Sequence, residues 1–504
     1  MPQNDLQINV INKIMMFLRT KLYPSLRVVV NWLIMFVISI LIMMLVSRDS
    51  YLYMLGPRCD SAWFFMCGKA WMNGMVPYVD FADSKGPLLW LIYGVGYLLS
   101  RYDYHGVFWV AVFFYSFTFY FLFKTALIFV NQSKQAILAV LMTSVFIFLP
   151  IFHNEIRAED FCMFFTSLSL WQLCRMLYTE HTESNEQTAF FIFGISLAGT
   201  LLIKFNITAM CCVFPAIGLY YLVRKHHPVL LPLLYCVAGF AAIALPFLIY
   251  FIIQGNFDAF IQEYFVNTLQ TIENKSRSPL FLGLNNKVRL MISYSLTLAF
   301  IILISVFGAL YLFVYKNTMF IFGLVFFVFT CIVSGASSYY YSICSVFVLY
   351  GCCILVNYLT KIGIGKLAIV GVIFLSYIYI IYANRTFLGC GCNKNMEKQI
   401  DDVECLISRV DSPKILYLAL ERGFGIRSNI LPSTKYWARQ NGATKEMKES
   451  ALKAISLSDV VVIDGNSSDY IETRKYVLSK GFKHVYYFQR TLAANDFNEI
   501  YMKK

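Results

Sequence analysis

Residues 28–46 are VVVNWLIMFVISILIMMLV, nineteen consecutive positions without a charged side chain. A helix of about 20 apolar residues crosses the ~30 Å hydrocarbon core of a membrane, so this stretch predicts a transmembrane helix. Lys13, Arg19, Lys21 and Arg27 precede it. Because Lys and Arg accumulate on the cytoplasmic side, residues 1–27 are predicted to form a cytoplasmic N-terminal segment.

The composition extends this prediction to most of the chain. Of its 504 residues 59% are hydrophobic and 14% are charged, whereas soluble domains are about 25% charged. This excludes a soluble globular enzyme, a disordered tail and a fibrous protein. The apolar runs are continuous rather than alternating, which favours helices over a barrel. We predict an all-α polytopic membrane protein with about eleven transmembrane helices, at 28–46, 106–123, 135–152, 161–178, 189–203, 207–223, 229–253, 288–314, 318–334, 342–359 and 366–383.

Segment 86–101 is apolar but short. Its ~15 residues cover only about 22 Å as a helix, so we expect a juxtamembrane helix instead of a span. The membrane domain then covers 28–383, and two large loops, 47–105 and 254–287, lie on the outer side. The tail, 384–504, lies outside as well.

The tail predicts a small soluble α/β domain. Short apolar runs bounded by turn residues indicate strands at Lys414–Leu420, Asp459–Ile463 and His484–Phe488, and helices are expected at 396–408 and 469–480. Such a domain could recognise an acceptor, contact a partner or cover a site.

The net charge of +13 is attributed to cytoplasmic loops. No basic stripe with interleaved aromatic residues is present, so we expect no nucleic-acid partner. The fourteen cysteines show no metal-ligand spacing.

The ionisable residues of the membrane domain gather at one face. The first outer loop contains Asp60, Asp80, Asp83 and Lys85, and residues 61–74 between them predict an amphipathic helix. These residues could form a polar site. Alternatively the loop is solvated and its acids cap helices, with Asp60 as the N-cap of 61–74.

The second outer loop, HNEIRAED at 153–160, contains Glu155, Arg157, Glu159 and Asp160, and Lys204 ends the fifth span. Helix-end charges and a snorkelling lysine are the alternative interpretations. Taken together, the charges could receive an anionic lipid head group. Lys85 and Lys204 would neutralise a phosphate, Arg157 could bind it in bidentate fashion, and a carboxylate could take a proton from an attacking hydroxyl.

These motifs resemble those of the GT-C glycosyltransferases, polytopic enzymes that use polyprenyl-phosphate sugars, such as protein O-mannosyltransferases and bacterial lipid A or core-sugar transferases. Asp60 resembles the family's first-loop acid, and the stretch from Pro77 to Leu88 resembles its Lys-Pro-Pro-Leu type motif, with Gly86 in place of the first proline. Residues 157–160 resemble its second-loop acidic motif, and Lys204 the lysine after its fifth span. The resemblance covers roughly residues 28–230.

The resemblance implies an inverting glycosyl transfer with Asp60 as the general base. The leaving group would be polyprenyl phosphate, bound by Lys85 and Lys204, and Glu159 would orient or activate the acceptor or assist Asp60. Residues 337–341, SSYYY, resemble a later tyrosine motif, although an interfacial aromatic belt is an alternative. The remaining candidates for substrate binding or for the base are Asp80, Asp83, Glu155, Asp160, Tyr339 and Tyr340.

We therefore expect a donor polyprenyl-phosphate sugar and an acceptor that is a lipid, a glycan or a protein. The site would face the periplasm or exterior from the inner (plasma) membrane. Some family members need a divalent metal, but no cofactor is favoured here. The alternative functions are a transporter or flippase for a lipid-linked sugar, and a polysaccharide polymerase.

Overall fold

The computed structural model describes most of the chain. Its described residues are 23–47, 49–52, 59–149, 155–179, 182–270, 323, 338–363, 365–387, 393–411, 413–419, 425–438, 445–467, 469–489 and 497–503.

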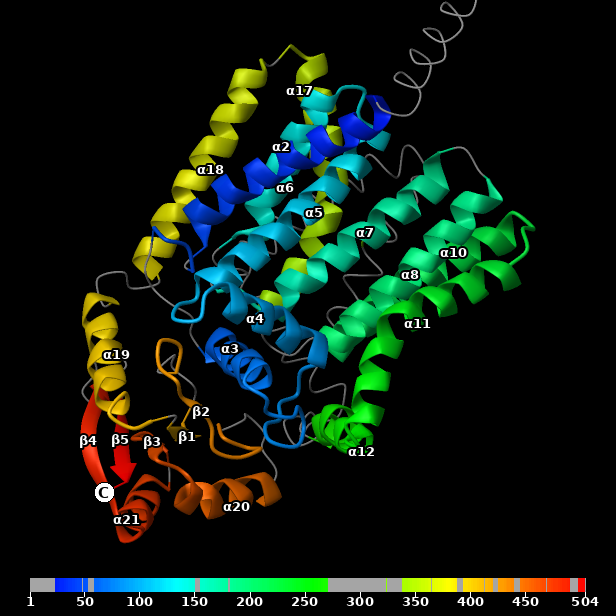
Figure 1. The fold of residues 1–504 in the computed structure, drawn as a ribbon. Helices are drawn as coiled ribbons and strands as arrows, with labels where there is room; N and C mark the ends of the chain where they lie inside the picture. Colours follow the sequence, from blue (N-terminus) through cyan, green and yellow to red (C-terminus); the bar gives the residue numbers. More distant parts are fainter. Residues whose placement is uncertain are drawn as a thin grey trace, which may run out of the picture.

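Long helices dominate these residues (Figure 1). Seven helices are long and apolar enough to cross a membrane, as in a multi-pass membrane protein: Leu26–Val46, His105–Phe129, Glu183–Ile203, Phe205–Arg224, Leu230–Ile253, Ser342–Lys361 and Lys366–Ala383. Among the described residues up to 387, the helices are α2 (Tyr23–Val46), α3 (Cys59–Met72), α4 (Pro87–Leu99), α5 (His105–Phe129), α6 (Ser133–Ile147), α7 (Ala158–Tyr178), α8 (Glu183–Ile203), α9 (Phe205–Cys211), α10 (Val213–Arg224), α11 (Leu230–Ile253), α12 (Phe257–Phe260), the π-helix η2 (Ile261–Val266), the 3₁₀-helix η3 (Ser338–Cys344), α17 (Ser345–Lys361) and α18 (Lys366–Phe387).

The predicted spans agree with these helices in position more than in length. Helix α6 is only 15 residues long where a span at 135–152 was predicted. Helix α7 carries Glu159, Asp160 and Arg175 near its ends and is not among the seven helices that are long and apolar enough to cross a membrane. The predicted spans 288–314 and 318–334 lie outside the described residues, except for Gly323. The count of eleven spans stays a prediction.

Helices α3 and α4 lie between the long helices and the C-terminal sheet (Figure 1). As predicted, α4 is short, with 13 residues. The prediction for α3 was partly wrong. The helix starts at Cys59, so Asp60 lies in its first turn instead of capping it, and every residue from Ser61 to Ala70 is buried. An amphipathic helix would expose its polar face, whereas residues of the tail cover that face here.

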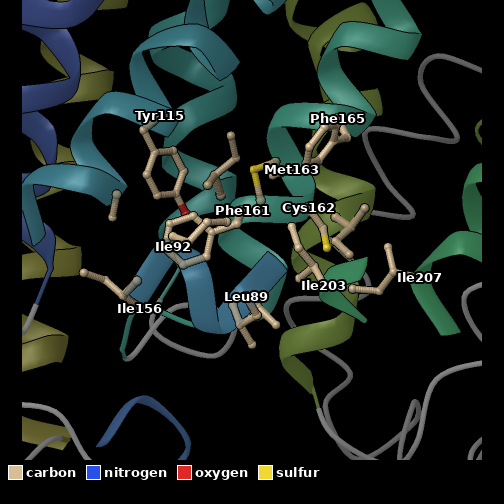
Figure 2. Packing of buried hydrophobic residues seen from close by; sticks show 14 of the residues in the cluster. Leu89, Ile92, Tyr115, Ile156, Phe161, Cys162, Met163, Phe165, Ile203 and Ile207 are labelled. Atoms are coloured by element: carbon tan, nitrogen blue, oxygen red, sulfur yellow. The ribbon is translucent and has the colours of Figure 1, made fainter. Parts of the chain in front are cut away.

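Apolar packing joins the helices that surround the site (Figure 2). Leu89 of α4, Phe161 of α7 and Ile203 of α8 are completely buried in one continuous core. Helices α8 and α11 approach each other backbone to backbone: a Cβ atom at Gly239 would lie 1.9 Å from the carbonyl oxygen of Phe191. Small residues allow such close helix contact inside membranes.

The tail contains the predicted strands and helices together with elements that were not predicted. The strands form one five-stranded sheet in the order β2-β1-β3-β5-β4, in which β2, β1 and β3 pair in parallel and β5 runs antiparallel to both of its neighbours, β3 and β4. The sequence did not predict strand β5, the two-residue strand β2 or helix α20. The elements are α19 (Asn393–Ile407), β1 (Lys414–Leu418), β2 (Leu431–Pro432), α20 (Lys445–Lys453), the 3₁₀-helix η4 (Ala454–Leu457), β3 (Val460–Asp464), α21 (Tyr470–Ser479), β4 (Phe482–Gln489) and β5 (Phe497–Lys503).

The close crossing of α8 and α11 gives a prediction about stability. We expect Gly239→Ala to destabilise the protein by about 1–3 kcal/mol, because the added methyl group has to push the two helices apart. Thermal unfolding in detergent measures this. The control is Gly371→Ala on α18, where a Cβ atom meets no other atom within 4 Å. Equal unfolding temperatures for the two variants would contradict the prediction.

Candidate active site

Two antiparallel helices bring Glu159 and Lys204 together. Helix α7 begins at Ala158 and α8 ends at Ile203, so the first turn of α7 lies beside the last turn of α8. Lys204 has an extended backbone between α8 and α9. Its ammonium forms an ion pair of 2.5 Å with Oε1 of Glu159, and both side chains are buried.

A backbone contact places Lys85 next to this pair. The amide of Gly86 donates a hydrogen bond of 3.0 Å to the carbonyl oxygen of Ile203. A Cβ atom at residue 86 would lie 2.1 Å from the carbonyl oxygen of Leu202. Only glycine fits here, because a side chain would collide with this backbone. Lys85 and Lys204 are consequently close enough to interact electrostatically.

The Lys85 ammonium has a hydroxyl and a carboxylate as neighbours. It donates a hydrogen bond of 3.1 Å to Oγ of Ser84, and Oδ2 of Asp83 lies 4.0 Å away. Burial lowers the pKa of Lys85, but the negative charges of Asp83 and Asp60 outweigh burial, and the pKa is raised overall. Lys85 therefore remains a cation.

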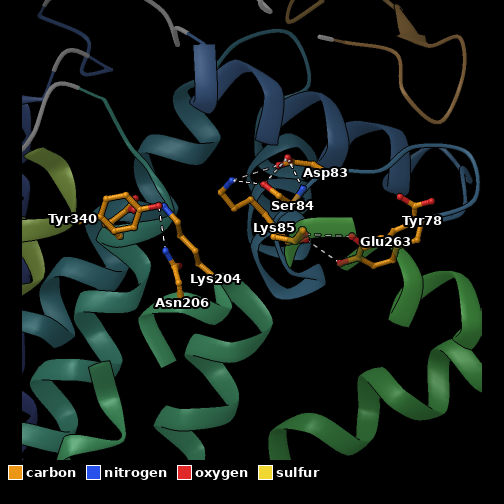
Figure 3. Close-up of polar contacts among 10 residues, drawn as sticks. Tyr78, Asp83, Ser84, Lys85, Lys204, Asn206, Glu263 and Tyr340 are labelled. Carbon is orange, nitrogen blue, oxygen red and sulfur yellow. Dashed lines mark hydrogen bonds and ion pairs between the residues drawn. The ribbon is translucent and has the colours of Figure 1, made fainter. Parts of the chain in front are cut away.

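Tyr340 completes this side of the site from a distant part of the sequence. Its ring centroid lies 3.9 Å from Nζ of Lys204, and its hydroxyl accepts a hydrogen bond of 3.2 Å from Nδ2 of Asn206 (Figure 3). Burial raises the pKa of Tyr340, but Lys204 opposes this effect and the pKa is lowered overall. Tyr339 also lies in η3, and its side chain is outside the described part of the structure.

The acidic side of the site is built from Asp60, Glu155 and Arg157. Arg157 Nε donates a hydrogen bond of 2.8 Å to Oε1 of Glu155, and Ser61 Oγ donates one of 3.1 Å to Oε2. Asp60 lies within electrostatic range of Glu155, Arg157 and Lys85. We call Asp60, Lys85, Glu155, Arg157, Glu159, Lys204 and Tyr340 the polar cluster.

The other predicted acids have local contacts. Oδ2 of Asp160 accepts a hydrogen bond of 2.6 Å from the amide of Arg157, and Oδ1 accepts one from the Tyr115 hydroxyl. Asp80 accepts a hydrogen bond of 2.7 Å from the amide of Val76. Asp160 thus caps the first turn of α7, in agreement with the helix-end interpretation, whereas Asp80 bonds an amide of its own loop and caps none of the described helices. Asp83 accepts a hydrogen bond of 2.6 Å from the amide of Ser84 and lies beside Lys85.

Several residues around the polar cluster were not predicted from the sequence. Ser61 and Asn206 each follow a predicted site residue closely in sequence and contact the cluster directly. Asp49 and Tyr93 hold the backbone of Ile156: Oδ2 of Asp49 accepts a hydrogen bond of 2.9 Å from the Ile156 amide, and the Tyr93 hydroxyl donates one of 2.8 Å to the Ile156 carbonyl oxygen. The position of Asp49 directly after the first span was a signal that could have identified it.

Metal-binding geometry was searched over the described residues. They contain no group of three or more His, Cys, Asp or Glu side chains arranged to hold an ion. In the polar cluster, Glu155 and Glu159 are each paired with a cationic side chain.

Glu155 gives a prediction about pH. Burial is the main cause that raises the pKa of Glu155 to about 7; Arg157 opposes the increase, while Asp60 and Asp49 add to it. The folded state thus binds this proton more tightly than the unfolded state. The stability that the folded state gains from this tighter proton binding is complete below the unfolded pKa of about 4.5. It is lost as the pH rises to about 7.

Because Glu155→Gln does not titrate, we expect its unfolding temperature to fall less than that of the wild type between about pH 5 and pH 7.5. Thermal scans across this range test the prediction. Glu449→Gln, on the exposed face of α20, should follow the wild type. Parallel curves for the wild type and Glu155→Gln would show that Glu155 does not titrate as described.

No protein-family model and no curated protein matches the sequence. Solved structures do match. ArnT from Cupriavidus metallidurans bound to undecaprenyl phosphate aligns over 96% of this chain and 98% of its own, with a TM-score of 0.56 and 13% identity. The apo state of ArnT aligns over 94% of this chain and 98% of its own, with a TM-score of 0.53 and 12% identity.

An oligosaccharyltransferase from Archaeoglobus fulgidus, tethered with an acceptor peptide, aligns over 92% of this chain and 74% of its own at a TM-score of 0.46 and 11% identity. At these identities a structural match shows a shared fold and not a shared activity. The ArnT match extends over nearly the whole of both chains, beyond the region in which motifs were detected. The chain has the fold of the GT-C glycosyltransferases.

Proposed function

We propose that the protein is a membrane glycosyltransferase that takes its sugar from a polyprenyl-phosphate donor. The observation that supports this most directly is that Lys85 lies within electrostatic range of both Lys204 and Asp60, although the three residues come from three separate segments. The fold adds support, since the ArnT structure that it resembles contains undecaprenyl phosphate.

The donor phosphate would bind between Lys85 and Lys204. Two ammonium groups that repel each other are stabilised by an anion placed between them, and the partly buried surroundings strengthen the attraction. Tyr340 packs against Lys204 and would limit the directions in which its ammonium can point. Arg157 would add a further positive charge at the edge of the phosphate.

Transfer would proceed by inversion at the anomeric carbon. Asp60 would accept the proton of the acceptor hydroxyl while the hydroxyl oxygen forms a bond to C1 of the sugar. The bond from C1 to the phosphate oxygen would break, and its electron pair would leave with the polyprenyl phosphate. Because this leaving group is already stable as an anion, the site needs only to stabilise its charge and to position the acceptor.

The two glutamates would act through their cationic partners. Glu159 is engaged by Lys204, so we propose that it orients this lysine, in place of the role toward the acceptor that the sequence suggested. Glu155 would orient Arg157 in the same way. The acceptor would be a lipid, a glycan or a protein at the outer face of the inner membrane.

The general base is tested with Asp60→Asn in purified, full-length protein. With a polyprenyl-phosphate sugar as donor, we expect kcat to fall by about 100-fold or more, because the amide cannot accept the proton. The control is Asp103→Asn, a change in the loop before α5, where an amide oxygen still accepts the hydrogen bonds of Ser100 and His105. Near wild-type turnover by Asp60→Asn would exclude Asp60 as the base.

The phosphate site is tested separately with Lys85→Met. We expect the KM for the donor to rise by about tenfold or more, because a charge-assisted contact to the phosphate is lost. Binding of undecaprenyl phosphate alone should weaken by a similar factor. Unchanged binding would contradict the assignment of Lys85 even if Asp60 proves to be the base.

A further inference from the structure

Residues 425–438, which we call the strap, connect the C-terminal sheet to the helix and the loop that carry the polar cluster. The strap is attached to β1 at two points. The amide of Ser433 donates a hydrogen bond of 3.0 Å to the carbonyl oxygen of Ile415, and the amide of Tyr417 donates one of 2.6 Å to the carbonyl oxygen of Trp437. The strap is therefore part of the folded sheet.

One side of the strap contacts α3. The Lys69 side chain of α3 is only 2% exposed, and its ammonium donates hydrogen bonds to the carbonyl oxygens of Gly425, at 2.7 Å, and Ser428. Trp437 is completely buried, and its ring centroid lies 5.5 Å from that of Trp63. A buried ammonium needs such acceptors, and the strap supplies two of them. The contact thus determines where α3 lies, and with it Asp60 in the first turn of that helix.

The other side of the strap contacts the loop that carries Lys85. The amide of Ala82 donates a hydrogen bond of 2.9 Å to the carbonyl oxygen of Lys435. The ammonium of Lys435 forms an ion pair of 2.8 Å with Oε1 of Glu263 in η2, and the hydroxyl of Tyr436 donates to the same oxygen at 2.8 Å. Glu263 is only 6% exposed, so solvent weakens this contact less than it weakens a surface ion pair.

The three residues 83–85 consequently lie between two backbone anchors. The strap holds Ala82, and the end of α8 holds Gly86. A segment this short between two anchors has few backbone conformations available. The position of the Lys85 ammonium thus depends on both anchors, although Lys435 and Glu263 do not themselves belong to the polar cluster.

We propose that Lys435 and Glu263 are positioning residues for Lys85. Their ion pair holds the backbone of Lys435 in the position in which its carbonyl oxygen accepts the hydrogen bond from the amide of Ala82. This inference rests on the proposed function, because it assigns the strap a part in donor binding. It also gives the C-terminal region a specific task within the site, in place of a separate binding domain.

The test uses full-length protein in detergent with Lys435→Glu, the conservative Glu263→Gln, and the double variant Lys435→Glu/Glu263→Lys. For Lys435→Glu we expect the KM for the polyprenyl-phosphate sugar to rise about tenfold while kcat changes less than about twofold, because Lys85 moves and Asp60 keeps its chemistry. Glu263→Gln should raise the KM by a smaller factor. The double variant should recover at least half of the kcat/KM that Lys435→Glu loses. Lys435→Arg, which keeps the positive charge, should lose less than half as much as Lys435→Glu.

Hydrogen exchange without substrate provides the second measurement. Peptides that cover residues 78–90 should exchange faster in Lys435→Glu, and the double variant should regain protection. Lys445→Glu, which removes the exposed pair of 3.6 Å with Glu449 in α20, should change neither measurement.

The outcomes separate the two proposals. Unchanged exchange in residues 78–90, or an unchanged donor KM in an active enzyme, would overturn the positioning role. A uniform loss of kcat and stability without rescue by the double variant would also overturn it, since that pattern indicates a general folding defect. If the wild type transfers no sugar, the proposed function fails, and exchange in residues 78–90 alone then decides whether the strap positions the loop.

Discussion

The contact between Gly86 and the last turn of α8 is the constraint on which the polar cluster depends. It joins the loop that follows α3 to the break between α8 and α9, and it does so through backbone atoms with no room for a side chain. Two lysines that lie far apart in sequence become neighbours as a result. Such a contact fixes their separation more firmly than side-chain interactions alone could, because backbone atoms have fewer degrees of freedom.

Charge balance explains how so many ionisable groups lie together in the polar cluster. Glu159 neutralises Lys204, Glu155 neutralises Arg157, and Asp83 lies beside Lys85. Breaking one buried pair leaves its partner uncompensated, which costs far more than an exposed pair contributes. The arrangement is also preorganised, since protein side chains hold these charges in their positions. Preorganised charge is what stabilisation of a departing phosphate requires.

The burial of α3 connects the membrane region with the tail. Considered alone, this helix has a polar face with Lys69 that should contact water. In the folded chain Lys69 instead meets carbonyl oxygens of residues 425–428, and Trp63 packs on Trp437. The tail therefore completes the core around α3. A helix that carries a site residue is more rigid when both of its faces are packed.

Hydropathy determined most of the fold, because a run of apolar residues such as 28–46 has few alternatives to a membrane helix. The outer-loop acids and Lys204 were also recognisable, since charges are scarce in such a chain. The sequence did not determine how these charges pair. Glu159 could have faced an acceptor, but the antiparallel meeting of α7 and α8 turns it toward Lys204. Tyr340 and the strap lie hundreds of residues from Lys85, and only tertiary packing brings them to it, because local periodicity carries no information about contacts between distant segments.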